Sequence, residues 1–322
     1  MNFSKFKIAV VIPVYRAENE IRSVLLGIPR FVRHIIVVDD ASPDSSADLV
    51  TTVAKKDKRI TLIRHAKNQG VGGAMVSGFK QALALGTEIV IKVDGDGQMD
   101  PHYLPALLTA VISGGADYAK GNRFRDFTSL QQMPLVRRVG NLGLSFLTKA
   151  ATGYWNLFDP TNGFFAIRAD VLSQLPLDKL DKGYFFETSM LAHLYLLDAC
   201  VQDVTIPARY RNETSSLSVR RALFEFPFKL TRTFLRRIVL KYFIFDFSMM
   251  SIYLLAGIPL LLFGLIFGIT KWIQYAELGI AAPTGTVILP TLSVILAIQI
   301  LLSAIEIDLN ATPRKAISKA LV

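Results

Sequence analysis

Three carboxylates follow an apolar run in the segment "IKVDGDGQMD", residues 91–100. Asp94 and Asp96 stand two residues apart, and the glycine after each of them allows the chain to turn. Carboxylates that converge in this way can hold one hard cation, and oxygen ligands favour Mg²⁺ or Mn²⁺. We therefore predict a metal site formed by Asp94 and Asp96 with the help of Gln98. Asp100 is better placed to cap the helix that follows it.

A calcium-binding EF-hand loop is the competing interpretation of this segment, and the spacing excludes it. The glycine position of such a loop holds Met99, and the position of its final glutamate holds Pro105. A strand-like run also precedes the segment, where an EF-hand has a helix. A solvated turn remains the alternative to a metal site.

Two other stretches combine an acidic residue with turn or aromatic residues: "FDPTNGF" (158–164) holds Asp159, and "GYFFETSM" (183–190) holds Glu187. A lone acid in a turn is usually structural, so spacing alone gives neither a function. The glycines in "NQGVGGAMVSG" (68–78) weakly suggest a phosphate-binding loop, but they do not match G-x-G-x-x-G. Tight helix packing explains these glycines equally well.

Strand-length runs rich in Val and Ile alternate with segments of helical spacing over the first 125 residues. This order predicts an α/β fold with a mostly parallel sheet covered on both faces. Ligands bind outside the carboxyl ends of such strands. We therefore expect the strand ends Pro13–Tyr15, Asp39–Asp40 and Asp94–Asp96 to line one cleft. The predicted strands are 7–15, 34–40, 59–65 and 88–94, and the predicted helices are 18–28, 42–56, 72–85 and 101–113.

Two uncharged segments raise the mean hydropathy of the 322-residue chain to +0.38. Residues 248–270 and 286–305 carry no charge, and a helix of either length can cross a ~30 Å hydrocarbon layer. A buried core helix is the alternative, but such helices rarely run so far without a polar stripe. Residues 221–247 mix Phe and Leu with Arg and Lys, which is typical of helices in a membrane interface.

These features predict three parts in the chain. Residues 1–220 form a cytoplasmic catalytic domain, and residues 221–247 form juxtamembrane amphipathic helices. Residues 248–322 form a membrane domain with spans at about 248–270 and 286–307 and a short cytoplasmic tail. The N-terminus does not resemble a signal peptide, which favours a cytoplasmic location for the catalytic domain.

The charge distribution supports this topology. The net charge is +10, and from residue 220 onward 11 basic and 5 acidic residues contribute +6 of it. Basic residues, Arg237 among them, flank both spans, whereas the connecting loop holds only Lys271, offset by Glu277. A basic collar suits anionic lipid headgroups, and we expect no nucleic acid partner. The single Cys200 excludes an internal disulfide and a cysteine-based zinc cluster.

Taken together, these stretches resemble the family 2 glycosyltransferases of the GT-A fold. More narrowly, the chain is similar to the polyprenyl-phosphate glycosyltransferases, the group that includes dolichyl-phosphate mannose synthase and bacterial membrane relatives with two C-terminal helices. The resemblance spans residues 7–220 and implies a GT-A catalytic domain with a Rossmann-like, mostly parallel sheet, followed by interfacial and transmembrane helices. Six segments carry it: "VVIPVYRAENEI", "IIVVDDASPDSS", "KVDGDGQMDP", "GNRF", "DPTNGFFAIR" and "GYFFE".

The resemblance also implies roles for residues on the donor side. Pro13, Tyr15 and Asp40 would hold the base and ribose of a nucleotide sugar. Asp94 would contact the nucleotide. Asp96, with Gln98 beside it, would bind the metal that bridges the diphosphate.

On the side of the phosphates and the acceptor, Arg123 of "GNRF" matches an arginine that faces phosphates, and Arg137 matches one that holds the acceptor phosphate. Asp159 and Glu187 would lie by the sugar and acceptor, and Arg211 near the diphosphate. Asp96, Asp159 and Arg123 are thus the candidate catalytic residues.

The chain departs from the group's pattern in three places. Many members carry "YNE" where this chain has "YRA", so an acidic nucleotide contact is missing or comes from Glu18. Phe165 follows "GF" in place of a basic residue, and Ser216 stands where relatives often carry lysine. These changes bear on which donor is used.

The predicted activity is the inverting transfer of one sugar, from a UDP-hexose or alternatively GDP-mannose, to undecaprenyl or dolichyl phosphate. We expect it to depend on a divalent metal and to occur at the cytoplasmic face of a membrane, in bacteria the inner membrane. The two-helix anchor also suggests a homo-oligomer. The alternatives are transfer to a saccharide or diacylglycerol, and a non-catalytic module that binds nucleotide sugar.

Overall fold

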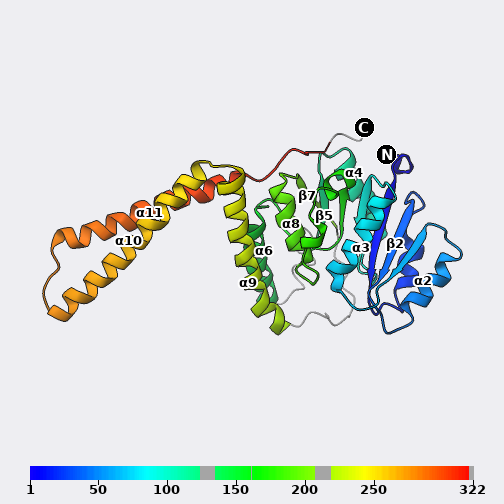
Figure 1. Ribbon diagram of the computed structural model, residues 1–322, viewed down its shortest axis with the longest axis horizontal. Helices are drawn as coiled ribbons and strands as arrows, with labels where there is room; N and C mark the ends of the chain where they lie inside the picture. The colour runs from blue at the N-terminus through cyan, green and yellow to red at the C-terminus, as the bar shows by residue number, and fades with distance from the viewer. Residues whose placement is uncertain (124–134, 161, 207–218, 319–322) are drawn as a thin grey trace. The chain divides into compact units, whose positions relative to one another are not determined.

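The computed structural model describes residues 1–123, 135–160, 162–206 and 219–318 (Figure 1). The chain divides into two compact units. The first comprises Met1–Phe234 together with Pro313–Val322, and the second comprises Leu235–Thr312.

The first unit is built on a seven-stranded sheet with the strand order β3-β2-β1-β4-β6-β5-β7. β1 pairs in parallel with β2 and β4, and β6 lies antiparallel between β4 and β5. The sequence prediction of a mostly parallel α/β sheet is confirmed. The strands are β1 (Ile8–Val14), β2 (His34–Asp39), β3 (Ile60–Arg64), β4 (Ile89–Lys92), β5 (Tyr118–Asn122), β6 (Phe165–Arg168) and β7 (Val201–Thr205).

Helices follow most of these strands and cover both faces of the sheet. The α-helices are α1 (Ile21–Gly27), α2 (Ser46–Ala54), α3 (Gly70–Ala84), α4 (Leu104–Ile112), α6 (Leu135–Thr152), α7 (Ala169–Leu172), α8 (Phe186–Leu196) and α9 (Val219–Val239). Three short 3₁₀ turns complete the described part: η1 (Phe3–Lys5), η2 (Pro101–Tyr103) and η3 (Leu177–Lys179).

The alternation of side chains along the strands separates the two cores. On β1, Ile8 and Val10 join a cluster that includes residues of α1, α2 and α4. Ala9 and Val11 point to the other face and join residues of α3 and α8. Because both faces are covered, the parallel strands are apolar throughout, and this is why they read as continuous runs.

Two predicted helices begin later than the sequence suggests: the one predicted as 18–28 begins at Ile21. The segment predicted as 42–56 is helical only from Ser46. Before it, the chain is tied to the loop after β1: Ser42 Oγ accepts from Arg16 N at 3.3 Å, and Glu18 Oε2 accepts from Ser45 N at 3.2 Å. These polar contacts compete with helix formation.

The C-terminal tail also belongs to the first unit. The carboxylate of Asp117, a fully buried residue, accepts hydrogen bonds from the backbone N–H groups of Cys200, Ile317 and Ser318, and from the Ser318 hydroxyl. The chain therefore leaves the first unit in α9 and returns to it after the second unit.

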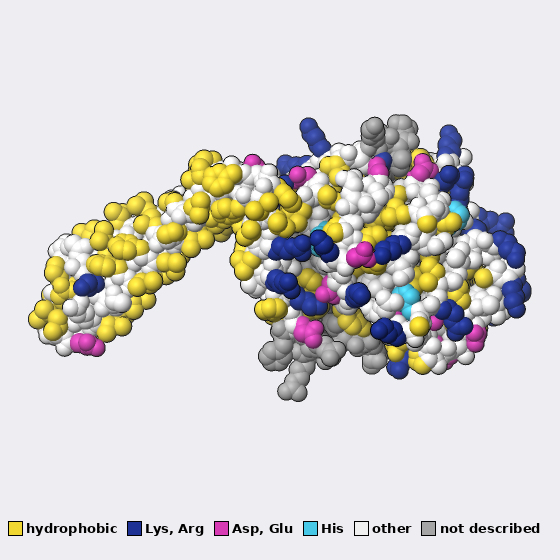
Figure 2. Space-filling model, in the orientation of Figure 1, with side chains coloured by type: hydrophobic (Ala, Val, Ile, Leu, Met, Phe, Trp, Pro, Cys, Tyr) yellow, Lys and Arg dark blue, Asp and Glu magenta, His cyan; other side chains and the backbone are white. Residues whose placement is uncertain are grey.

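The second unit contains two long apolar helices, α10 (Met249–Leu278) and α11 (Thr284–Asn310), preceded by the π-helical turn η4 (Leu240–Phe245). Only 11% and 22% of their most apolar windows are buried, so they are not core helices. Hydrophobic side chains cover most of the visible hairpin (Figure 2). Both helices are long enough to span a membrane, and each exceeds its predicted length.

Small residues and one ion pair hold this unit together. A Cβ on Gly264 would come within 2.8 Å of Val294, so glycine permits the close approach of α10 and α11. The Arg237 guanidinium donates to both carboxylate oxygens of Asp308, at 2.6 and 2.9 Å, and Tyr242 donates to the same group. Arg237 is thus buried, whereas the charge pattern of the sequence suggested a residue facing lipid headgroups.

Candidate active site

A cleft of about 1090 Å³ opens in the first unit at the carboxyl ends of β1 and β4. Pro13, Tyr15, Asp40, Asp94 and Asp96 line it, as the alternation of strands and helices predicts, whereas Asp39 is buried and does not line it. Its lining combines polar and charged side chains with apolar ones, Leu144 and Phe226 among them. Its lining also includes Glu20, Gly70, Lys92, Gln98, Arg123, Leu144, Asn162, Gly163, Glu187 and Phe226.

The turn after β4 presents the two acids that the sequence singles out. Gly97 has a φ of +71°, a conformation that favours glycine. Asp96 Oδ1 accepts from Gln98 N at 2.9 Å, which fixes the turn. Asp100 accepts from His102 N at 3.0 Å and caps η2, so its predicted capping role is confirmed.

Lys92 is a component of the cleft that the sequence analysis missed. Its side chain is 2% exposed, and Nζ lies 3.0 Å from Asp94 Oδ1 and 2.9 Å from Glu187 Oε1. Burial opposes its charge, but the carboxylates of Asp94 and Glu187 raise the pKa of Lys92 above its ordinary value. A lysine inside an otherwise apolar strand was the available signal.

Gly163 closes this ion-pair group from the other side. A Cβ at this position would collide with Lys92 Nζ and lie 3.2 Å from Glu187 Oε1. The glycine of "DPTNGF" is therefore required by close packing against charged groups.

Asp159 lies beneath the cleft and bonds to a residue that lines it. Asp159 is fully buried and does not itself line the cleft. Arg123 Nε donates to Asp159 Oδ2 at 2.9 Å, and a terminal nitrogen of Arg123 donates to Oδ1 at 3.2 Å. Since the Arg123 side chain is 39% exposed, this arrangement aims a fixed guanidinium into the cleft.

A second buried lysine supports the same region. Lys120 Nζ donates to the carbonyl oxygen of Pro160 at 2.5 Å. Burial lowers the pKa of Lys120 to about 8, although the charges of Asp159 and Asp203 act in the opposite direction. Burial likewise raises the pKa of Asp203. The part of the cleft around Arg123 thus rests on a group of buried charges.

Asp40 holds the loop that enters α3. Its carboxylate accepts from the N–H groups of Gln69 and Gly70, each at 2.8 Å, and lies 2.7 Å from His65 Nδ1. His65 Nε2 lies 2.9 Å from Ser77 Oγ. Ser77 does not line the cleft, so we interpret this Asp–His–Ser chain as a support for the loop.

The glycines of this loop serve packing. Gly72 N donates to Lys182 O at 2.8 Å, and a Cβ on Gly72 would collide with Asp181 O. Gly70 does line the cleft, but its N–H is bonded to Asp40. Of the two interpretations that the sequence left open, tight packing is the one these contacts support.

The remaining residues singled out from the sequence are Glu18, Arg137, Arg211 and Ser216. Glu18 bonds to Ser45 and does not line the cleft, although Glu20 does. Arg137 lies in α6, but its side chain falls outside the described residues. Arg211 and Ser216 also fall outside them.

The side-chain oxygens of Asp96 and Gln98 at the turn fit an Mg²⁺ or Mn²⁺ ion that takes most of its other oxygen ligands from a bound phosphate compound and water. Among the described residues, no three His, Cys, Asp or Glu side chains form a metal-binding group. Asp96 lines the cleft beside Gln98, while Asp94 is paired with Lys92. Such cations are commonly bound by one or two carboxylates together with phosphate oxygens and water.

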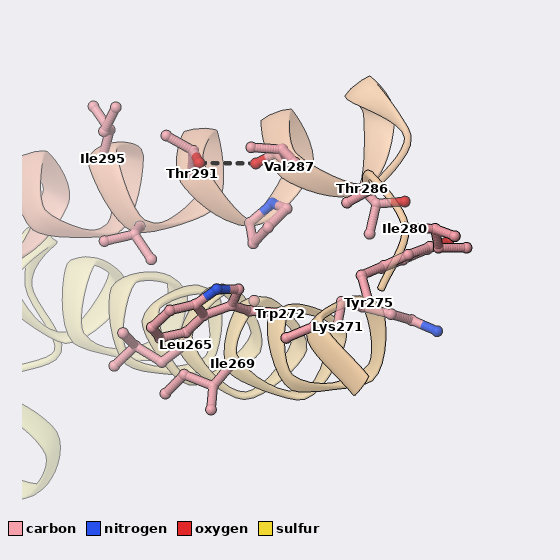
Figure 3. Close-up of a pocket in the computed structure, with 16 residues that line it drawn as sticks. Leu265, Ile269, Lys271, Trp272, Tyr275, Ile280, Thr286, Val287, Thr291 and Ile295 are labelled. Carbon is pink, nitrogen blue, oxygen red and sulfur yellow. Dashed lines mark hydrogen bonds between the residues drawn. The ribbon is translucent and has the colours of Figure 1, made fainter. Parts of the chain in front are cut away.

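A second cavity, of about 650 Å³, lies between α10 and α11 (Figure 3). Its lining is mainly apolar and includes Leu265 and Trp272 of α10 and Ile295 of α11. The Thr291 hydroxyl donates to Val287 O of its own helix at 2.8 Å. This cavity presents few groups able to do chemistry, so the cleft in the first unit is the candidate active site.

Comparisons with known proteins agree with this choice. The model of the family described as Glycosyl transferase family 2 matches residues 9–175, which include the turn after β4. A UDP-N-acetylglucosamine–dolichyl-phosphate N-acetylglucosaminyltransferase of Methanococcus voltae is 32% identical over 190 residues, covering 55% of this chain and 75% of that protein. An undecaprenyl-phosphate mannosyltransferase of Micrococcus luteus is 32% identical over 206 residues, covering 62% of this chain and 82% of that protein.

A solved structure supports the fold. Glucosyl-3-phosphoglycerate synthase from Mycobacterium tuberculosis, in complex with Mn²⁺, UDP-glucose and phosphoglyceric acid, has a TM-score of 0.54 and 20% sequence identity. The match covers 73% of this chain and 81% of that chain. The predicted GT-A-like fold is thereby confirmed.

Proposed function

Since this chain belongs to glycosyl transferase family 2, we propose that it transfers one sugar from a nucleoside diphosphate sugar to polyprenyl phosphate. One observation carries the proposal: a single cleft combines the Asp94–Asp96 turn and Arg123 with apolar side chains that include Leu144 and Phe226. The names of both relatives specify a polyprenyl-type phosphate acceptor. The two long apolar helices would keep the enzyme beside such a lipid.

The proposed chemistry needs charge neutralisation at the donor. An oxygen of the lipid phosphate attacks the anomeric carbon in line, the bond from that carbon to the donor's β-phosphate oxygen breaks, and the nucleoside diphosphate leaves. A phosphate monoester has a second pKa near ~6, so the attacking oxygen needs no general base. In-line attack inverts the configuration at the anomeric carbon.

We assign the leaving-group side to Asp96, Gln98 and Arg123. Asp96 and Gln98 would hold the metal, which, when bound, neutralises charge on the diphosphate. Arg123, fixed by Asp159, would stabilise the same charge from the other side. Arg211 is proposed to lie near the diphosphate as well.

The donor is proposed to be a UDP-hexose, with GDP-mannose as the alternative. The name of the M. voltae relative specifies a UDP-sugar, and that of the M. luteus relative a mannosyl group. Pro13, Tyr15 and Asp40 are proposed to hold the nucleoside, with Asp94 in contact with it. Tyr15 is 47% exposed and available to a base.

Arg137 is proposed to hold the acceptor phosphate. Its replacement in Arg137→Ala should raise the KM for polyprenyl phosphate more than the KM for the donor, because only the acceptor loses a cation. Steady-state kinetics with each substrate varied in turn measures both constants. A larger rise in the donor KM contradicts this role.

For the membrane we propose two spans with the first unit on the cytoplasmic face, in a bacterium the face of the inner membrane. The clustering of basic residues around the spans supports this orientation. The exposed Leu142 and Phe146 on α6 and Phe228 on α9 would suit the adjacent lipid interface.

The test is transfer of radiolabelled sugar by the full chain in vesicles containing polyprenyl phosphate, diacylglycerol or neither. UDP-glucose, UDP-N-acetylglucosamine and GDP-mannose serve as donors, each with Mn²⁺. We expect label only in a lipid-phosphate product. Label in a glycolipid or a polymer supports the alternative acceptors, and the absence of both transfer and donor hydrolysis supports a non-catalytic module.

A further inference from the structure

Lys92 joins two parts of the cleft that are distant in the sequence. It ends β4, directly before the Asp94–Asp96 turn, and its ammonium reaches Glu187 in the first turn of α8, 95 residues away. Nζ contacts one oxygen of each carboxylate, at 3.0 Å for Asp94 and 2.9 Å for Glu187. No role for this lysine follows from the motifs that identify the family.

The surroundings leave the ammonium little freedom. Lys92 is 2% exposed, and the backbone of Gly163 packs so closely that a Cβ there would collide with Nζ. Asp94 anchors the ammonium from the turn. Glu187, whose side chain is 11% exposed, is thereby held at one oxygen while it lines the cleft.

An unrestrained glutamate would contribute less to binding a neutral hydroxyl ligand. A carboxylate that is already ordered loses little conformational entropy when it accepts a hydrogen bond. A hydroxyl-rich ring beside the diphosphate is the kind of ligand that such a fixed acceptor recognises. Nucleotide and diphosphate, by contrast, would depend on Asp94, Asp96 and Arg123.

We propose that Lys92 is a positioning residue that fixes Glu187 as a hydrogen-bond acceptor for the sugar of the donor. Lys92 itself acts through Glu187 and does not bind the sugar. This inference rests on the proposed function, because it presupposes a nucleotide sugar in the cleft. It adds a specificity group to that function: the Lys92–Glu187 pair distinguishes a nucleotide sugar from the free nucleotide.

The experiment measures two dissociation constants for each variant, by calorimetry on the full chain in detergent with Mn²⁺. One is for UDP-N-acetylglucosamine and the other for UDP, with GDP-mannose and GDP as the second pair. The readout is the ratio of the two constants, which cancels effects on the nucleotide or the metal. The variants are Lys92→Met, Glu187→Gln and their combination, with Lys80→Met, an exposed lysine of α3, as the matched control.

We expect Lys92→Met to weaken sugar-nucleotide binding by about tenfold relative to nucleotide binding, the size of one lost hydrogen bond to a charged group. Glu187→Gln should change the ratio in the same direction. Because Lys92 acts through Glu187, the double variant should match Glu187→Gln alone. Lys80→Met should keep the wild-type ratio.

A wild-type ratio in Lys92→Met overturns the proposal, and so does a double variant in which the two effects add. If Lys92→Met fails to fold, Glu187→Gln decides, since it keeps Lys92 and Asp94 paired: an unchanged ratio there also overturns the proposal. If the wild-type chain binds neither sugar nucleotide, the proposed function itself fails, and the Lys92 proposal fails with it. The wild-type measurement therefore separates the two failures.

Discussion

Each of the two units buries a cation against a carboxylate, but only one of these pairs faces a ligand cleft. In the second unit, Arg237 and Asp308 are 1% and 5% exposed, and Tyr242 adds a further hydrogen bond. In the first unit, Lys92 is equally buried, but Asp94 keeps 28% of its side chain exposed. A closed pair holds helices together, whereas an open pair leaves carboxylate oxygens available to a ligand.

The two sites differ in how the cost of burying charge is offset. Removing two ions from water is unfavourable, and good geometry with additional hydrogen bonds must offset it. Both oxygens of Asp308 accept from Arg237, so that pair is satisfied without any ligand. In the cleft, Lys92 Nζ contacts Oδ1 of Asp94 and Oε1 of Glu187. These two carboxylates therefore retain capacity to accept hydrogen bonds from the donor.

The first test removes Asp96, the acid of the cleft that would bind the metal. Asp96→Ala should lower transfer by about 10²–10³-fold, because charge on the leaving diphosphate loses its counter-ion. The protein should still fold, since Asp96 lines the cleft and its hydrogen bond from Gln98 N lies within the turn. Asp48→Ala, on the exposed surface of α2, is the matched control and should keep normal activity. Normal turnover by Asp96→Ala contradicts the metal site.

The second test breaks the closed pair. Arg237→Met should destabilise the second unit by about 3–5 kcal/mol, because it leaves the Asp308 carboxylate buried without its cation. Thermal unfolding in detergent measures the loss. Replacing both residues, as in Arg237→Met with Asp308→Leu, should recover part of it. Equal stability of Arg237→Met and the wild type would mean that the pair contributes nothing to the hairpin.

The smallest expected effect concerns Lys120, whose pKa burial lowers to about 8 from 10.5. Between these pH values the unfolded chain binds more protons than the folded chain, so this residue makes stability rise with pH. Below pH 8 the cost of its buried charge is fully present. The stability of the wild type relative to Lys120→Met should therefore increase from pH 8 to pH 10 and stay level below pH 7.

Fluorescence can isolate the first unit in this measurement. The chain has two tryptophans, and a Trp272→Phe background leaves Trp155 as the reporter. A difference between the two proteins that does not vary with pH would refute the lowered pKa.

The sequence predicted the strands, helices and caps that depend on a local pattern of residues. The strands 7–15 and 34–40 correspond to β1 and β2 within one residue at each end, because strands buried on both faces are continuous apolar runs. The cap at Asp100 follows from the proline after it. The two long apolar helices follow from the absence of charge over long segments.

What the sequence did not predict are contacts between distant segments. The Lys92–Glu187 pair joins β4 to α8 across 95 residues of sequence. No local pattern indicated that Asp159 would bond to Arg123 and Asn162, and its predicted place beside the sugar and acceptor stays a prediction. The docking of the tail at Asp117 has no local pattern at all.

The proposed transfer is tested most directly by the release of nucleoside diphosphate from the purified chain in vesicles, with and without polyprenyl phosphate. We expect release only when polyprenyl phosphate and Mn²⁺ are both present, with one nucleoside diphosphate for each sugar found on the lipid. Release at the same rate without the lipid phosphate, or in excess EDTA, would contradict it.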